Sequence, residues 1–125
     1  MVMDSLLIVD DSIDLLNLYR AMIARMGGYR IAGMASDGNE AISAYRGLDR
    51  KPDLVLMDVN MPNLDGISAA MAIQRMDSAA NILFVTAENI YHKDLPAELS
   101  ESAILKKPFS RDELFRALKT RIKRK

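Results

Sequence analysis

Short, uniformly apolar segments alternate along this chain with longer segments of helical periodicity. The apolar segments cover residues 6–9, 54–57 and 82–85, and each has the length of a strand rather than of a helix. Uniform hydrophobicity, without alternation, predicts strands that are covered on both faces, as in a parallel sheet. Alternation of such strands with helices predicts βαβ units with right-handed crossovers. We therefore expect an α/β fold, with one parallel sheet between two layers of helices.

Weaker patterns complete the alternation. Two further strands are expected at residues 29–35, whose mixed polarity suits a position near a sheet edge, and at 103–105. Helices are expected at residues 12–26, 37–50, 67–76 and after Ser110. A fourth helix between 88 and 102 should be short or irregular, because Pro96 interrupts this polar segment. Five strands and about five helices result.

Two helix starts carry a recognisable side-chain pattern. Asp37 with Glu40, and Ser110 with Glu113, match the capping box, in which two side chains bind each other's backbone N–H groups. Both patterns predict that a helix begins at that point.

Composition restricts the class of protein and its compartment. With 125 residues the chain has the length of one domain, and its formal net charge is zero. No overall field attracts nucleic acid or membranes, and the basic run 119–125 is interpreted as a solvated helix end. The absence of cysteine excludes disulfides, and no apolar run approaches the ~20 residues of a membrane helix. We expect a cytoplasmic protein that binds neither nucleic acid nor membranes directly.

Polar residues occupy the carboxyl ends of four expected strands. They are Asp10, Asp11, Asp58, Thr86 and Lys107. The carboxyl ends of parallel strands meet at one edge of the sheet, where ligands bind. We therefore expect these five side chains to converge on one small site.

The chemistry of such a site follows from its charges. Three neighbouring carboxylates repel one another, so a cation should lie among them. Mg²⁺, or Mn²⁺, prefers oxygen ligands, and Lys107 supplies a second positive charge. Both would hold the oxygens of a phosphoryl group in transfer, for which a carboxylate can be the nucleophile. The Thr86 hydroxyl is a suitable donor to one of those oxygens.

Each of these residues also has an ordinary explanation. Two aspartates before a helix suit its N-terminus, and Asp58 suits a turn. Thr86 is a common strand-end residue, and Lys107 alone would be a solvated lysine. Only one of Lys106 and Lys107 can point into the site, and the lone His92 is expected at the surface. Joint placement at four strand ends nevertheless favours a functional site.

Six short motifs follow one another along the chain. They are Leu-Ile-Val-Asp-Asp at 7–11, Pro-Asp-Leu-Val-Leu-Met-Asp at 52–58, Met-Pro at 61–62, Leu-Asp-Gly at 64–66, Val-Thr-Ala at 85–87 and Lys-Pro-Phe at 107–109. In this order they resemble the receiver domains of two-component response regulators over roughly residues 5–121. The resemblance implies a doubly wound, flavodoxin-like sheet with strand order 2-1-3-4-5. Residues 1–125 would hold one receiver domain and no output domain.

The resemblance also implies residue roles in metal binding and phosphorylation. Asp58 would accept the phosphoryl group. Asp10, Asp11, Asp58 and the backbone carbonyl of Asn60 would hold Mg²⁺.

Further roles at matching positions concern the phosphoryl group once it is attached. Thr86 and Lys107 would bind it, and the Lys107–Pro108 peptide would be cis. Asn60 and Glu88 would flank the approach of the hydrolytic water and so influence the lifetime of the acyl phosphate.

The chain departs from the family pattern at the expected output face. The family usually has an aromatic residue at the position of Ile104, which moves inward on activation. Ile104 is therefore assigned to the switch, but an isoleucine cannot make an aromatic rotation. The irregular segment 88–102 replaces the usual fourth helix, and Glu101-Ser102-Ala103 replaces the usual Gly-Ala pair.

The sequence thus predicts a phosphoacceptor signalling domain, not a metabolic enzyme, that catalyses its own phosphorylation and dephosphorylation. A sensor histidine kinase or phosphotransfer protein would donate, and an unidentified downstream protein would bind near the fourth and fifth strands and helices. The domain would be a monomer or a phosphorylation-dependent dimer. One alternative is a pseudo-receiver that is never phosphorylated. The other is an aspartate-nucleophile phosphatase, which would carry a second acid where this chain has Asn60.

Overall fold

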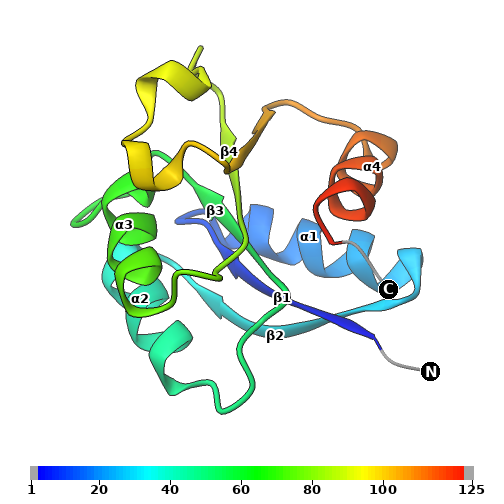
Figure 1. Cartoon of the computed structure of the whole chain (residues 1–125). Coiled ribbons are helices and arrows are strands. Elements are labelled where there is room, and N and C mark those ends of the chain that lie inside the picture. The colour runs from blue at the N-terminus through cyan, green and yellow to red at the C-terminus, as the bar shows by residue number, and fades with distance from the viewer. Residues whose placement is uncertain (1–2, 123–125) are drawn as a thin grey trace.

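A single five-stranded parallel sheet lies between two layers of helices in the computed structural model, which describes residues 3–122 (Figure 1). The strands are β1 (Asp4–Val9), β2 (Tyr29–Ala35), β3 (Leu54–Asp58), β4 (Ile82–Thr86) and β5 (Ala103–Lys106). They lie in the order β2-β1-β3-β4-β5, and every neighbouring pair is parallel. The predicted fold class and strand order are confirmed, including the edge position of residues 29–35.

Four α-helices within the described residues cover the sheet. They are α1 (Ile13–Met26), α2 (Gly38–Gly47), α3 (Gly66–Met76) and α4 (Arg111–Arg121). Side chains of α1 and α4 form one buried cluster with the sheet, and side chains of α2 and α3 form a second cluster on the opposite face. Successive residues of a strand point to opposite faces, so Val55 and Met57 enter one cluster while Leu54 and Leu56 enter the other. This two-sided burial explains why the central strands are apolar throughout.

Helix boundaries follow local capping, with one correction. Ser110 and Glu113 form the predicted reciprocal capping box at the start of α4. The predicted box at α2 is wrong in one half: Asp37 accepts from the N–H of Glu40, but the Glu40 carboxylate accepts from Ser36 instead. The neighbouring Ser36 offers both a backbone N–H and a hydroxyl, which makes it the better partner.

The α2 helix ends three residues before the predicted position 50. Its last residue is Gly47, and the ammonium group of Lys51 donates to the carbonyls of Tyr45, Arg46 and Leu48. Carbonyls at a helix end have no partner within the helix, so a side chain beyond the helix satisfies them.

The segment between β4 and β5, which is described throughout, has no α-helix. It forms two single turns of 3-10 helix, η1 (His92–Asp94) and η2 (Ala97–Leu99). Pro96 is the residue before η2, and the buried side chains of Leu95 and Leu99 attach the segment to the core beside α3. The short, irregular element was predicted; the count of about five helices was one α-helix too high.

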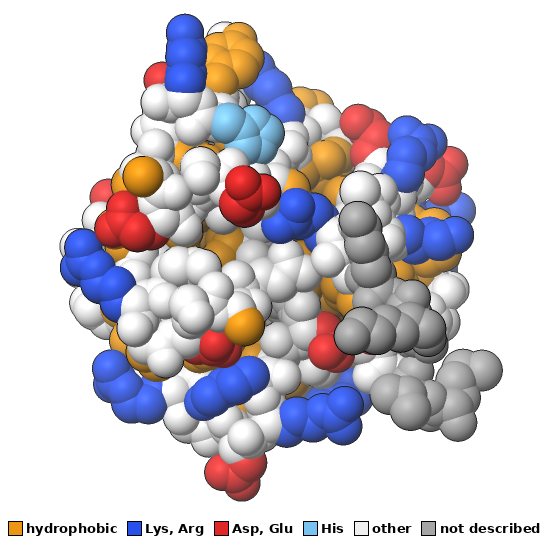
Figure 2. All heavy atoms as spheres, viewed as in Figure 1, with side chains coloured by type: hydrophobic (Ala, Val, Ile, Leu, Met, Phe, Trp, Pro, Cys, Tyr) orange, Lys and Arg blue, Asp and Glu red, His pale blue; other side chains and the backbone are white. Residues whose placement is uncertain are grey.

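Surface charges on the face seen in Figure 2 are mixed in sign, with Lys and Arg interspersed among Asp and Glu. Within residues 3–122, no helix is both long and apolar enough to cross a bilayer. The basic run 119–125 is described only in part: residues 119–121 end α4, and residues 123–125 lie outside the described residues.

Candidate functional site

Three carboxylates meet at the carboxyl edge of the sheet. Asp10 follows β1 directly, Asp11 comes next, and Asp58 is the last residue of β3. Their side-chain oxygens lie within 4.8 Å of one another. Asp10 and Asp58 are only 1% and 5% exposed, whereas Asp11 is open to solvent. The cluster, called the acidic pit below, therefore has two buried acids and one acid that faces solvent.

Lys107 is the cation of the site. Its Nζ lies 3.1 Å from Oδ2 of Asp10 and 3.3 Å from Oδ1 of Asp58. The backbone N–H of Lys107 donates to the Thr86 carbonyl at 2.8 Å, and the Lys107–Pro108 peptide is cis. Lys106 points away from the acids and contacts Asn89. Of the two neighbouring lysines, Lys107 is therefore the one whose side chain contacts the acids.

The electrostatics of Asp58 favour a further cation. The pKa of Asp58 is raised to about 6, first by burial and then by the charge of Asp10, while Lys107 opposes both effects. Three ionised acids and one lysine leave an excess of two negative charges. Mg²⁺ carries two positive charges and takes carboxylate oxygens as ligands, so the donor set and the charge of the site both suit it.

Thr86 ends β4 inside the same pit. Its side chain is buried, and its Oγ1 accepts a hydrogen bond from the N–H of Glu88 at 3.0 Å. A hydroxyl that accepts in this way keeps its own hydrogen for another acceptor. Thr86 therefore offers a donor beside the carboxylates.

A side-chain hydrogen bond joins the two loops that follow β3 and β4. The Asn60 amide donates to the Glu88 carboxylate at 3.0 Å, and both side chains are exposed. Asn60 lies two residues after Asp58, the last residue of β3, and Glu88 lies two residues after Thr86, the last residue of β4.

The loop after β3 is held by a close approach of backbone atoms. The N–H of Gly66 donates to the Val59 carbonyl at 2.9 Å. A Cβ at position 66 would lie 2.0 Å from the carbonyl oxygen of Asp58, which no side chain can occupy. Glycine is required here because α3 begins directly against the strand that carries Asp58.

Ile104 lies on β5, away from the carboxylates. It is half-buried and packs against the core cluster of α2 and α3. A hollow of about 330 Å³ separates it from the loop after β4, with a lining of Glu88, Asn89, Ile90, Tyr91, His92, Ile104 and Lys106. His92 is exposed, as predicted, and its Nε2 lies 2.8 Å from the Ser102 carbonyl.

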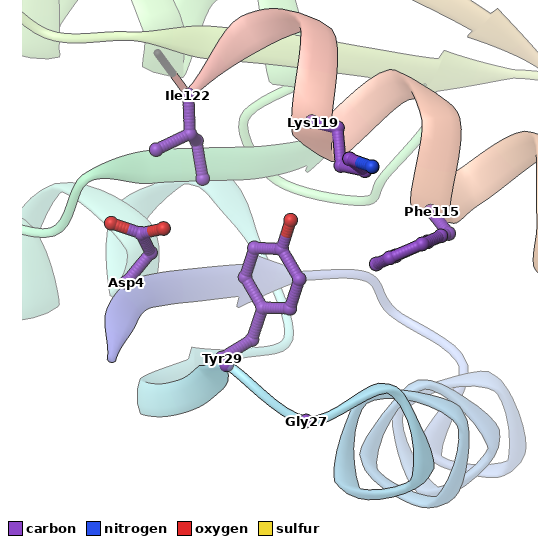
Figure 3. A pocket seen from close by; sticks show the side chains of 7 residues that line it. Asp4, Gly27, Tyr29, Phe115, Lys119 and Ile122 are labelled. Carbon is purple, nitrogen blue, oxygen red and sulfur yellow. The ribbon is translucent and has the colours of Figure 1, made fainter. Parts of the chain in front are cut away.

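A larger hollow of about 620 Å³ lies at the far end of the sheet (Figure 3). In that view Tyr29 stands between Asp4 on β1 and three side chains of α4 and its end, which are Phe115, Lys119 and Ile122. Its lining contains none of the three acids and no Lys107, so the candidate site remains the acidic pit.

One residue near the pit was not singled out in the sequence. Tyr19 on α1 is buried, and its ring stacks on Phe109 with centroids 5.9 Å apart. The spacing of Leu16, Tyr19 and Ile23 on one helix face was a signal that it points inward. Burial raises the pKa of Tyr19, and the charges of Asp10 and Asp58 raise it further.

A family model and individual relatives both indicate one protein family. The family model described as response regulator receiver domain matches residues 6–119. The chemotaxis protein CheY of Thermotoga maritima is 40% identical over 81 residues, which are 65% of this chain and 65% of that protein. The CheY of Halobacterium salinarum is 34% identical over 113 residues, covering 90% of this chain and 91% of that protein.

Solved structures agree. The CheX–CheY–BeF3–Mg²⁺ complex from Borrelia burgdorferi superposes with a TM-score of 0.85 at 26% identity, covering 95% of this chain and 89% of that one. The fold, the acidic pit and the family match together carry the assignment: this chain belongs to the receiver domain family of response regulators in two-component signalling.

Proposed function

We propose that Asp58 is the phosphoacceptor of this receiver domain. The observation that carries the proposal is the position of its carboxylate, buried between Asp10 and Lys107 at the end of β3. A carboxylate held beside a lysine and a cation-binding pair of acids has the surroundings that phosphoryl transfer requires. Asp10 is the other buried carboxylate beside Lys107 among residues 3–122, but its Oδ1 already accepts a hydrogen bond from the N–H of Ser12.

The transfer step is a displacement at phosphorus. One Asp58 oxygen forms a bond to the phosphorus, and the bond from phosphorus to the imidazole nitrogen of a phosphohistidine, or to the acyl oxygen of a small donor, breaks. The leaving group keeps the bonding electron pair: the imidazole takes up a proton, and the carboxylate of an acyl phosphate leaves as the anion. Lys107 stabilises the charge on the transferred oxygens, and the Thr86 hydroxyl donates to one of them.

Asp10, Asp11, Asp58 and the backbone carbonyl of Asn60 would hold Mg²⁺ or Mn²⁺. When bound, the ion neutralises the acids and the phosphoryl oxygens. Asn60 and Glu88 would flank the approach of the hydrolytic water, and the hydrogen bond between their exposed side chains supports a joint role in setting the lifetime of the acyl phosphate.

The attached phosphoryl group adds roughly −1.5 to −2 charges and three acceptor oxygens. Thr86 and Lys107 turn toward these oxygens, which moves the loop after β4 and the surface around Ile104. A downstream protein reads this surface, and the donor is a histidine kinase or a phosphotransfer protein. We further propose that residues 5–121 form the receiver unit. The protein would act in the cytoplasm, as a monomer or a phosphorylation-dependent dimer.

Replacing Thr86 by alanine is expected to leave phosphorylation possible but to uncouple the surface. The variant keeps the acids and Lys107 yet loses the hydroxyl that connects the phosphoryl group to the Glu88 backbone. Amide shifts of residues 86–109 should change on phosphorylation in the wild type and change much less in Thr86→Ala. Thr120→Ala, which removes a hydroxyl bonded to the Arg116 carbonyl on α4, should behave like wild type. Equal shifts in wild type and Thr86→Ala would contradict this route.

Intact-mass measurement tests the proposed function itself. The chain is incubated with Mg²⁺ and acetyl phosphate, with EDTA in a parallel sample. A receiver gains the mass of one phosphate, and only with the metal. A phosphatase would consume many donor molecules without accumulating phosphate, and a pseudo-receiver would do neither. Either of the last two results contradicts the proposal.

A further inference from the structure

The loop between β3 and α3 contains a residue in a left-handed backbone conformation. Asn63 has a φ of 69°, the only positive φ at a non-glycine residue among residues 3–122. Asparagine tolerates this conformation better than most residues do, but it still costs free energy. Such conformations persist where the surrounding contacts hold them, and they cluster at functional sites. Asn63 lies between Asp58, the last residue of β3, and Gly66, the first residue of α3.

Two hydrogen bonds connect this loop to the N-terminus of α2. The side-chain amide of Asn63 donates to Oδ2 of Asp37 at 3.2 Å, and the N–H of Gly38 donates to the Leu64 carbonyl at 3.2 Å. A Cβ at Gly38 would lie 2.4 Å from that carbonyl oxygen, so the helix and the loop are in close contact. Oδ1 of Asp37 accepts from the N–H of Glu40. The Asp37 carboxylate therefore caps α2 with one oxygen and holds the loop with the other.

The same loop carries Asn60 near its start. The side-chain amide of Asn60 donates to the Glu88 carboxylate at 3.0 Å, and its backbone carbonyl is one of the Mg²⁺ ligands proposed above. Only two residues separate Asn60 from Asn63, and the second of them, Pro62, has a fixed φ. A change in the backbone at Asn63, such as the loss of its bond to Asp37, therefore displaces Asn60 as well.

We propose that Asn63 is a positioning residue, whose hydrogen bond to Asp37 holds the loop in the conformation that presents the Asn60 carbonyl to the metal. This inference rests on the proposed function. A loop that is ordered before the ion binds loses less conformational freedom on binding, so a preorganised loop raises the affinity. The N-terminus of α2 thus contributes to metal binding, although none of its own groups is assigned to the ion.

Exchanging the two partners tests the inference. Asn63→Asp alone brings two carboxylates together, so the contact should break, while aspartate still tolerates the left-handed conformation. Adding Asp37→Asn restores a pair of one amide and one carboxylate at the wild-type net charge, and asparagine caps a helix about as well as aspartate. Asn39→Asp is the matched control, because it adds the same charge at an exposed residue in the first turn of α2.

Three measurements are made on each variant: Mg²⁺ affinity by calorimetric titration, the side-chain amide resonances of Asn60 by NMR without the ion, and urea unfolding. Asn63→Asp should bind Mg²⁺ about 3- to 10-fold more weakly than wild type, the range for one hydrogen bond, although its added charge alone would favour the ion. Its Asn60 resonances should shift. The double variant should bind within about twofold of wild type, with wild-type Asn60 resonances. Asn39→Asp should bind at least as tightly as wild type.

Either of two results overturns the inference and leaves the proposed function standing: unchanged Mg²⁺ affinity in Asn63→Asp, or no recovery in the double variant. A purely structural role for Asn63 would lower the free energy of unfolding and move neither the affinity nor the Asn60 resonances. Asn63→Gly, which adopts a positive φ freely but lacks the amide, is a second variant and must show the same loss of affinity. A wild-type chain that neither binds Mg²⁺ nor takes up phosphate contradicts the proposed function and the inference together.

Discussion

The Asp58→Asn variant is expected to take up no phosphate from Mg²⁺ and acetyl phosphate, a decrease of at least about a thousandfold in rate. An amide is not a nucleophile at phosphorus, and we expect the remaining acids not to replace Asp58, because Asp10 also accepts from the N–H of Ser12 while Asp11 is exposed. Intact mass after the incubation described above is the measurement. A variant that still gains phosphate would show that another residue is the acceptor.

The same variant should be more stable than wild type at neutral pH. The pKa of Asp58 is about 6 in the folded chain, above its ordinary value of 3.8. Below about pH 4 the group is protonated in the folded and the unfolded chain, so its full contribution to stability is present. As pH rises through about 6, the folded chain must ionise a buried carboxylate, and that contribution is lost. The asparagine side chain does not ionise, so the variant should gain about 2–3 kcal/mol over wild type at about pH 7.5 and little at about pH 4.

Urea unfolding followed by circular dichroism at both pH values measures this difference. Asp49→Asn makes the same chemical change at an exposed residue and should alter stability by less than about 0.5 kcal/mol. Mg²⁺ should stabilise wild type more than Asp58→Asn at the higher pH, because the ion offsets the repulsion that the variant already lacks. If the stability difference between wild type and Asp58→Asn were the same at both pH values, ionisation of the buried Asp58 carboxylate would not be what destabilises the wild type.

Gly66→Ala is expected to produce the second large effect, a loss of more than about 3 kcal/mol in unfolding free energy. The new Cβ would lie 2.0 Å from the carbonyl oxygen of Asp58 and 3.0 Å from Cα of Val59. Both contacts are with backbone, so relief requires α3 to move away from β3 and Asp58 to shift with the loop. Phosphorylation of the folded fraction should therefore also be slower.

Gly47→Ala is the matched control for this substitution. Gly47 ends α2, a Cβ added there would meet nothing within 4 Å, and its φ is not positive. Alanine there should be neutral or stabilising by up to about 1 kcal/mol, since alanine is the better helix former. Urea unfolding measures both variants. If Gly66→Ala and Gly47→Ala had equal stabilities, α3 would be able to move away from Asp58 at little cost in free energy.

The sheet and the acidic pit could be predicted because they depend on patterns that one strand carries by itself. Uniform hydrophobicity in residues 54–57 requires cover on two faces, and a polar residue at 58 then falls at the carboxyl edge. That rule applied to each strand separately brings Asp10, Asp58 and Lys107 together without knowledge of any contact.

Features that depend on contacts between distant residues could not be predicted from the pattern of a single segment. The end of α2 is set by Lys51, whose side chain satisfies the free carbonyls. The choice between Lys106 and Lys107 depends on how the end of β5 lies against β4. The stack of Tyr19 on Phe109 depends on how α1 lies against the segment after β5.

The distribution of the pit over four strand ends has a consequence for protein synthesis. Asp10 and Asp58 leave the ribosome well before Lys107, which follows Asp10 by 97 residues and emerges only after β5. A nascent polypeptide that stops before β5, or one cleaved in the loop ahead of it, carries Asp58 without the lysine that balances its charge. The complete acidic pit therefore forms only once β5 and Lys107 have been translated.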